Sequence, residues 1–237
     1  MRKVLIMLMI LAVSLFPANK VSLDASTVTG YSIKADTGNY LDIGFTVKDI
    51  NISEVSTEKG TFSSITIDNG YLSMEAGLPA LPSFHELIAM PYGANPEVEV
   101  LSYDSKIYKL SELGIENRII PAQPSYAKNS KPEDRKFIYN ESAYSISKFS
   151  GDPIATITKS GTMRGVGVGA LHVNPFRYNP VEGTIEVLNN LQVRVNYIDV
   201  DPQSEQIKAE SYSPYFESAY STLINYKPSS VKSDLMT

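Results

Sequence analysis

The chain has 237 residues, of which 43% are hydrophobic and 20% charged, a composition typical of a globular protein and unlike that of a disordered one. Its net charge of −5 argues against nucleic-acid binding, which depends on clustered Lys and Arg. The absence of cysteine excludes disulfides, zinc–thiolate sites and a cysteine nucleophile, and two histidines without a carboxylate cluster favour neither a metal site nor an enzyme.

Residues 1–25 are predicted to form a signal peptide. Two basic residues at the start precede an apolar run, residues 4–16, that has signal-peptide length and is too short to span a bilayer. Cleavage after Ala18 and cleavage after Ala25 are both open. We therefore expect an exported protein, periplasmic or extracellular, without a membrane span after signal cleavage.

The dominant hydrophobic period of residues 26–226 is two, which predicts an all-β domain. Asp68-Asn69-Gly70 and Asn189-Asn190 are each predicted to form the turn of a β-hairpin, because such turns require residues that tolerate positive φ. Between residues 191 and 197, Leu, Val, Val and Tyr alternate with polar residues, so one face is predicted to be buried and the other wet. The pattern predicts an antiparallel β-sandwich.

Two features that resemble ligand sites have simpler interpretations. His85 lies in the predicted apolar strand 84–90 and is expected to pack and make one hydrogen bond rather than to bind a ligand. The glycines of Gly165-Val-Gly167-Val-Gly169 are not followed by the helix that a dinucleotide-binding loop requires. They are predicted to lie within a strand, at a bend or a close backbone contact.

One short C-terminal helix is predicted, with Ser213 as N-cap and Pro214 as the first helical residue. Its apolar residues fall on one stripe: Tyr215, Phe216, Ala219, Tyr220, Leu223 and Ile224. Residues 227–237 are polar and lack an apolar period, which predicts a disordered tail or linker.

Residues 121–144 are predicted to form a polar loop that projects from an ordered scaffold. Pro121 and Pro124 favour an extended backbone at its start. Residues 127–136 carry four cations, two anions and almost no apolar side chain, so their burial would be unfavourable. Two interpretations remain open: a solvated surface loop, or a loop that offers a cation, first of all Lys128, to an acidic pocket of a partner.

Short motifs in a fixed order carry a family resemblance. They are Gly77-Leu-Pro79-Ala-Leu-Pro82, Met90-Pro91-Tyr-Gly93-Ala94, Pro121-Ala-Gln-Pro124-Ser, Lys128-Asn129, Phe137-Ile-Tyr139-Asn140, Gly161-Thr-Met-Arg164-Gly165 and Ser213-Pro214-Tyr215-Phe216-Glu217. From residue 77 to residue 226, the chain resembles the N-terminal propeptide, or prodomain, of gingipain-type cysteine peptidases.

The resemblance implies a non-catalytic domain that covers the active site of a gingipain-like cysteine peptidase catalytic domain and assists its folding. In the family pattern, a basic residue that precedes an Asn after Pro-x-x-Pro-Ser enters the specificity pocket, and Lys128-Asn129 fits this pattern. Lys131 and Arg135 are then flanking cations of the inhibitory loop. Lys128, in place of Arg, implies a Lys-preferring target or one that tolerates Lys. No cofactor is implied.

Two departures from the family pattern leave the mode of action and the processing site open. The chain ends at Thr237 without a protease, so the domain could act in cis, as part of a longer precursor, or in trans, as a separate inhibitor. Lys227 and Lys232 are the candidate processing sites, although Pro228 would hinder cleavage after Lys227. The competing function is a secreted β-sandwich binding or adhesion module without a protease partner.

Overall fold

The computed structural model describes residues 19–23, 25, 27–131 and 135–228. Its strands are β1 (Asn19–Ser22), β2 (Gly30–Asp36), β3 (Tyr40–Thr46), β4 (Asp49–Thr57), β5 (Gly60–Thr66), β6 (Tyr71–Leu72), β7 (Pro82–Met90), β8 (Asn95–Lys109), β9 (Ala155–Met163), β10 (Val166–Val173), β11 (Phe176–Asn179) and β12 (Thr184–Ile198). The helices are α1 (Ser204–Ser211) and α2 (Glu217–Tyr220), with 3-10 turns η1 (Leu110–Leu113), η3 (Ala143–Ser145) and η4 (Pro214–Phe216). Most of the predicted signal peptide, residues 1–18, and most of the predicted tail, residues 229–237, lie outside the described residues.

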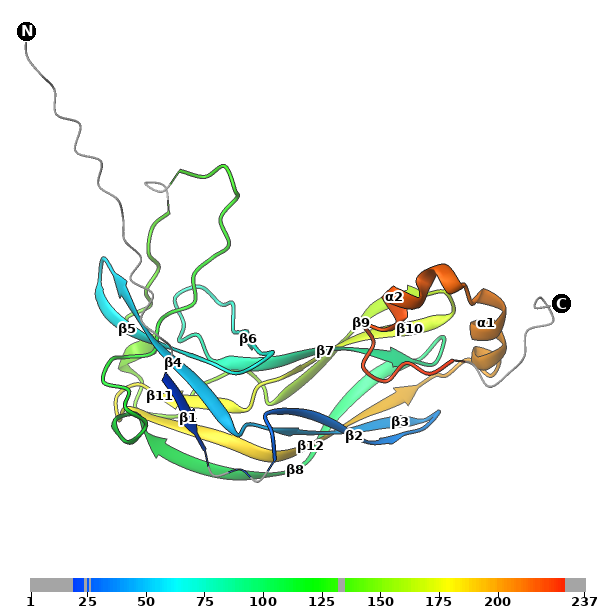
Figure 1. The fold of residues 1–237 in the computed structure, drawn as a ribbon, viewed down its shortest axis with the longest axis horizontal. Helices are drawn as coiled ribbons and strands as arrows, with labels where there is room; N and C mark the ends of the chain where they lie inside the picture. The colour runs from blue at the N-terminus through cyan, green and yellow to red at the C-terminus, as the bar shows by residue number, and fades with distance from the viewer. Residues whose placement is uncertain (1–18, 24, 26, 132–134, 229–237) are drawn as a thin grey trace, which may run out of the picture.

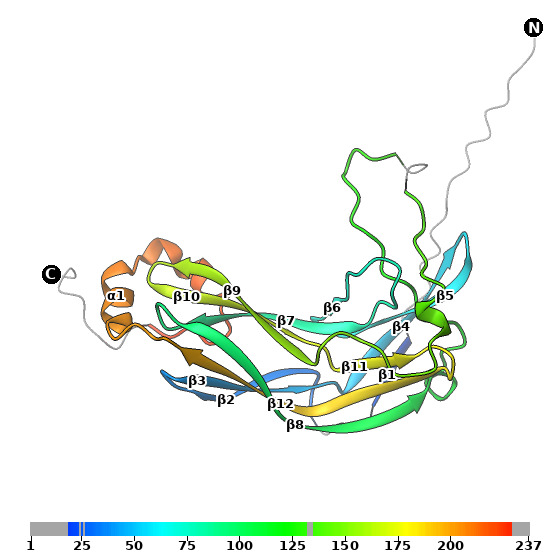
Figure 2. The ribbon, with the colours of Figure 1, turned by 180° about the vertical axis from the view of Figure 1, so that it is seen from behind.

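The strands form two main layers and one small sheet (Figures 1 and 2). One layer has the strand order β11-β12-β3-β2, with β8 also paired to β12, and the other has the order β6-β7-β10-β9. The sheet β1-β4-β5 lies at one end of the long axis, and the helices lie at the other end. All ladders between the described strands are antiparallel, so the predicted all-β sandwich with a short C-terminal helix is confirmed.

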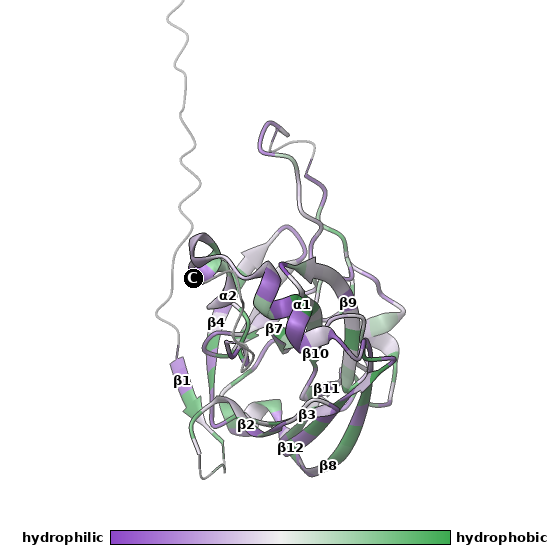
Figure 3. Cartoon of the chain, turned by 90° about the vertical axis from the view of Figure 1, so that its right-hand side faces the viewer, coloured by the Kyte–Doolittle hydropathy of each residue, from purple (hydrophilic) through white to green (hydrophobic). Residues whose placement is uncertain are grey.

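The hydrophobic core lies between the two layers, which face each other when the molecule is viewed end-on (Figure 3). Ile43 and Val193 of one layer, and Ile88 and Leu171 of the other, have no exposed surface. Full burial of one such side chain contributes about 1.5–3 kcal/mol. The alternating pattern of apolar residues therefore predicts that burial between the two layers is the main contribution to the stability of the fold.

The prediction of alternation in residues 191–197 is confirmed, but the Asn189-Asn190 hairpin is wrong. Leu191, Val193, Val195 and Tyr197 are buried, while the chain runs through Asn189-Asn190 as one long strand, β12. The pairing with β8 shifts register there, as in a β-bulge. Asn189 bonds the backbone of Val47 in both directions, at 2.7 and 3.1 Å. Asn189 therefore replaces ladder bonds by pairing with neighbouring backbone, and Asn190 donates to the carboxylate of Asp104, so the chain continues as one strand.

The hairpin predicted at Asp68-Asn69-Gly70 is also wrong. The turn itself forms, with φ of +57° at Asn69 and a hydrogen bond from Gly70 N to Ile67 O of 3.1 Å. Its flanking strands do not pair with each other. β5 pairs with β4 in the small sheet, and β6 pairs with β7 in one of the main layers. The ladder between β4 and β5 has seven residue pairs, whereas β6 has only two residues. Pairing of β5 with β4 therefore forms more backbone hydrogen bonds than pairing with β6 could.

The predicted C-terminal helix is shorter than expected. Ser213 has extended backbone and makes no side-chain cap, and Pro214–Phe216 form a 3-10 turn before α2, which has four residues. Tyr215 is 92% exposed and does not belong to a buried stripe. Helix α1 is not predicted from the sequence, because most of its eight residues are polar and only Ser204 and Ala209 are buried.

The predictions for His85 and for two of the three glycines agree with the structure, whereas Gly165 lies in the turn between β9 and β10, at a φ of +75°. Gly167 and Gly169 lie within β10, beside a register shift, and a Cβ at Gly167 would lie 2.9 Å from the carbonyl oxygen of Pro91. His85 packs between Tyr71 and His172 and shares a 3.0 Å hydrogen bond with Ser83 Oγ. None of the helices in the described ranges has the length and apolar character that crossing a membrane requires.

The stacked histidines make the stability of the fold sensitive to pH. Their ring centroids are 4.0 Å apart, on directly opposed residues of β7 and β10. Burial lowers the pKa of His85, and His172 lowers it further. The neutral ring is therefore favoured in the folded state, and the stability that this provides is present above the unfolded pKa of about 6.5 and lost as the pH falls below it.

We expect the free energy of unfolding to decrease from about pH 7.5 to about pH 5.5. The substitution His172→Phe keeps an aromatic ring against His85 and removes the charge that lowers the pKa of His85, so this variant should lose less stability over the same interval. Denaturant unfolding of both proteins at the two pH values measures the difference. An equal decrease in both proteins would contradict the assignment.

Candidate functional site

The loop of residues 121–144 starts from a segment that is bonded to two other parts of the chain. Ser63 of β5 exchanges backbone hydrogen bonds with Arg118 and Ile120, at 2.9 and 2.8 Å. On the other side, Ala122 N donates to Leu78 O and Gly77 N donates to Ala122 O, both at 2.8 Å. The start of the loop is therefore held on both sides as a strand would be.

The returning half of the loop packs on the same base. Phe137 and Tyr139 lie against the ring of Phe62, with centroid distances of 5.7 and 5.9 Å. Tyr144, which is 1% exposed, donates its hydroxyl to Ile119 O at 2.7 Å, and burial raises its pKa. Both ends of the loop therefore meet at one aromatic base beside β5.

Side-chain hydrogen bonds join the two limbs of the loop above this base. Gln123 donates its amide to Ile138 O at 2.8 Å and accepts from Ile138 N at 2.9 Å. Further out, the hydroxyl of Tyr126 donates to Lys136 O at 2.8 Å. These contacts hold residues 123–126 and 136–138 together as two linked limbs that project from the body of the molecule (Figure 1).

Lys128 and Asn129 occupy the centre of a turn on the outgoing limb of the loop. The turn is closed by a 2.9 Å hydrogen bond from Ser130 N to Ala127 O, and both central residues are exposed. The far end of the loop is hydrophilic (Figure 3). Among the described residues, no carboxylate forms an ion pair with Lys128.

The other two predicted loop cations have different positions. Lys131 is exposed next to the turn. Arg135 instead points back to the turn, where its Nε donates to Ser130 Oγ at 3.1 Å and its Nη2 donates to Ser130 O at 3.0 Å. Arg135 therefore supports the turn as well as carrying a charge. Pro132, Glu133 and Asp134 lie outside the described residues.

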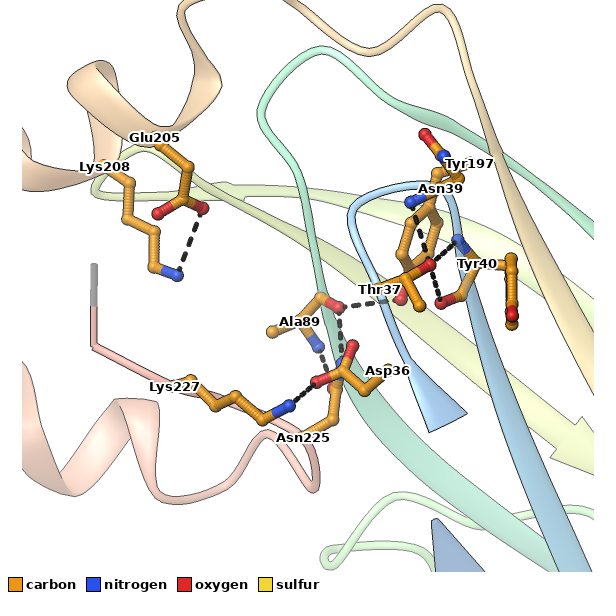
Figure 4. Close-up of polar contacts among 10 residues, drawn as sticks. All are labelled: Asp36, Thr37, Asn39, Tyr40, Ala89, Tyr197, Glu205, Lys208, Asn225 and Lys227. Carbon is orange, nitrogen blue, oxygen red and sulfur yellow. Dashed lines mark hydrogen bonds and ion pairs between the residues drawn. The ribbon is translucent and has the colours of Figure 1, made fainter. Parts of the chain in front are cut away.

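A second polar site surrounds Lys227, the first candidate processing residue (Figure 4). Its ammonium forms a 2.7 Å ion pair with Asp36, whose side chain is 14% exposed. Asn225 pairs with the backbone of Ala89 in both directions, at 2.7 and 2.9 Å. The segment therefore binds to the edge of β7 in the way that an additional strand would. Lys232 lies outside the described residues.

This C-terminal site borders a pocket of about 300 Å³. The pocket is lined by the end of β2, by Tyr197 and by Glu205 and Lys208 of α1, which are 3.6 Å apart. No local pattern in the sequence points to Asp36 or Asn225, because each makes its contact with a residue far away along the chain. The described residues contain no group of three or more His, Cys, Asp or Glu that could hold a metal ion.

Comparison with known proteins identifies relatives of the whole domain. The chain is 36% identical over 229 residues to "Lys-gingipain HG66" of Porphyromonas gingivalis, which covers 95% of this chain and 13% of that protein. It is 25% identical over 186 residues to "Gingipain R1" of the same organism, covering 78% of this chain and 18% of that protein. The chain therefore spans about an eighth of the length of the Lys-gingipain relative.

Two solved structures have similar folds. A chain described under "Structural insight into zymogenic latency of gingipain K" of Porphyromonas gingivalis has a TM-score of 0.70 and 34% identity, covering 76% of this chain and 98% of that one. A chain from the "Complex of Porphyromonas gingivalis RgpB pro- and mature domains" has a TM-score of 0.66 and covers 83% of this chain and 98% of that one. At 22% identity, the second match shows the fold alone.

The family described as Propeptide_C25 matches residues 33–232, which include both the projecting loop and the C-terminal site. Together with the Lys-gingipain relatives, this match confirms the resemblance that the motifs indicated. The chain belongs to the Propeptide_C25 family and is a non-catalytic gingipain-type propeptide domain.

Proposed function

We propose that this propeptide inhibits a gingipain-like cysteine endopeptidase by inserting Lys128 into the specificity pocket of the protease. The observation that carries the proposal is the position of Lys128, exposed in a closed turn on a loop whose limbs are linked and whose base is part of the fold. An ammonium in this position can reach a carboxylate inside a cleft without any rearrangement of the sheets.

The construction of the loop suits an inhibitor better than a substrate. The links at Gln123 and Tyr126 reduce the number of conformations that the loop must lose on binding, which favours affinity. If the bond after Lys128 were cut, both new ends would stay attached to the aromatic base at Phe62. Re-formation of the bond or slow release of the ends would then keep the pocket occupied.

The proposed partner is a gingipain-like catalytic domain, acting in cis in a longer precursor or in trans. One structural neighbour comes from a complex of RgpB pro- and mature domains, and the relatives at 36% identity are Lys-gingipains. Lys128 at the turn is in line with a Lys-preferring target. The same association would assist folding, because a domain that binds only the folded protease stabilises it by mass action.

The alternative of a secreted binding module without a protease partner has less support. Its expected feature is an aromatic surface, whereas the element that projects furthest from the described body is a charged loop with a lysine turn (Figures 1 and 3). The family membership favours the propeptide function as well.

Two neighbouring lysines of the loop are expected to contribute unequally to inhibition. Lys128→Ala should weaken inhibition of a Lys-specific gingipain-type protease by about 2–5 kcal/mol, or roughly thirtyfold to several thousandfold. The reason is that the substitution would leave the carboxylate in the specificity pocket of the protease buried and unpaired. Lys131→Ala, which removes an exposed charge, should cost about 0–1 kcal/mol. Inhibition constants of the two purified variants measure the difference. Small and equal effects would refute insertion of Lys128.

The links between the two limbs are expected to matter as well. Gln123→Ala removes two hydrogen bonds between the limbs, each worth about 0.5–1.5 kcal/mol. We expect weaker inhibition by about tenfold and faster cleavage within the loop, measured by inhibition constants and by mass spectrometry of the digested propeptide. Gln206→Ala, on the exposed face of α1, is the matched control and should change neither. A Gln123→Ala variant that inhibits and resists cleavage like the control would show that the links are dispensable.

The position of strand β1 favours one of the two candidate signal cleavage sites. Asn19–Ser22 form β1, which pairs with β4, and Leu23 is buried in the core. Cleavage after Ala25 would remove this strand, so the pairing supports cleavage after Ala18, earlier than the boundary expected at residue 25. We expect N-terminal sequencing of the exported protein to begin at Asn19. A protein that begins at Ser26 would contradict this placement.

A further inference from the structure

Strand β8 has one free edge in the described part of the molecule. β12 is the only described strand that pairs with it, and Lys159 of β9 bonds Gly93 O and Asn95 near the start of β8. The seven residues Leu101–Ile107 are all exposed, although they lie within a strand of 15 residues. A long edge strand with this exposure offers unpaired backbone groups to another strand.

The free part of β8 is regular enough to act as a template. Residues 104–109 pair in unbroken register with residues 184–189 of β12, and the register shifts lie only beyond Asn189. The backbone groups that do not bond to β12 therefore alternate along the outer edge at the normal strand spacing. Three exposed apolar side chains accompany them: Leu101, Tyr103 and Ile107, which are 42, 42 and 56% exposed.

The sequence of this edge is complementary to itself in one antiparallel register. With Ser105 opposite Ser105 of a second copy, Asp104 lies opposite Lys106 twice, once on each side of the two-fold axis. On the other face, Tyr103 lies opposite Ile107, also twice. Opposed residues of an antiparallel pair share a face, so one face carries two ion pairs and the other two apolar pairs.

Neighbouring registers lack this complementarity. Pairing about residue 104 would place Asp opposite Asp, and pairing about residue 106 would place Lys opposite Lys. Pairing about Tyr103 would place Asp104 opposite Ser102 and Lys106 opposite Val100, without any charge pair. Because like charges directly opposite each other are unfavourable, the sequence selects a single register.

We propose that two copies of the propeptide associate through β8, as an antiparallel strand pair centred on Ser105. The two sheets β11-β12-β3-β2 then become one continuous sheet across the interface, with a two-fold axis and the same surface used by both copies. Within one chain, Asp104 accepts a hydrogen bond from Asn190, and Lys106 lies 5.0 Å from the ring of Tyr108 in its own strand.

This association is independent of the proposed inhibitory function. The loop of residues 121–144 projects from the opposite side of the molecule to β8 in both views (Figures 1 and 2). A pair of propeptides joined at β8 would therefore leave both Lys128 turns accessible. Failure of the pairing would leave the inhibition proposal untouched, and the reverse also holds.

Sedimentation equilibrium of the purified chain between about 1 μM and about 1 mM tests the proposal. We expect a concentration-dependent dimer for the wild-type protein. Asp104→Lys and Lys106→Glu each place like charges opposite each other twice, so each variant alone should dimerise about tenfold more weakly. Lys148→Glu, an exposed charge reversal outside β8, should dimerise like the wild type.

Charge complementation provides the decisive arm of the experiment. In an equimolar mixture of the two variants, the lysine introduced at position 104 of one chain faces the glutamate introduced at position 106 of the other. The native Lys106 and Asp104 of the two chains also face each other, so a heterodimer should form with the affinity of the wild type. The double variant Asp104→Lys/Lys106→Glu should also regain self-association. Circular dichroism confirms that each variant is folded. A wild-type chain that stays monomeric, or a mixture without heterodimer, would overturn the proposal.

Discussion

Backbone hydrogen bonds between residues 118–122 and two distant segments determine where the charged loop leaves the body of the molecule. Ser63 of β5 holds one side of this stretch, and residues 77–80 hold the other. Residues 127–136 of the loop cannot serve as an anchor, because their many charges would be costly to bury. Its position relative to the sandwich therefore depends on a base that is made of ordinary sheet-like bonding and of the aromatic contacts of Phe62.

This construction connects the loop to the stability of the fold. The rings of Phe62, Tyr139 and Tyr144 form a small aromatic group that joins the main core through Tyr144, whose hydroxyl donates to Ile119 O. Residues 77–80 lie between β6 and β7, and these two strands are also joined by the stack of Tyr71 on His85. Contacts that stabilise the sandwich are thus the same contacts that orient the loop, and loss of the first would disorder the second.

The features that could be predicted from the sequence are those with a local cause. Alternation in residues 191–197 and the polarity of residues 127–136 follow from burial of apolar side chains alone. Strand pairing could not be predicted in this way. Asn69 and Asn190 both adopt positive φ, yet Asn69 lies in a turn between the small sheet and one main layer, whereas Asn190 lies at a bulge within β12. The role of Arg135 was also missed, because a charged residue in a polar loop gives no sign that it bonds Ser130.

The C-terminal site has a consequence for the choice between action in cis and in trans. Asn225 and Lys227 bind the chain to β7 and β2 at one end of the long axis, while the Lys128 turn projects near the other end (Figure 1). For a catalytic domain on the same chain, with its specificity pocket at Lys128, the segment that leaves the C-terminal site would have to span the distance between that end and the Lys128 turn. A separate protease has no such constraint. Binding in cis thus raises the effective concentration of the loop at the pocket by an amount that depends on the connecting segment, whereas binding in trans depends on the affinity of the interface alone.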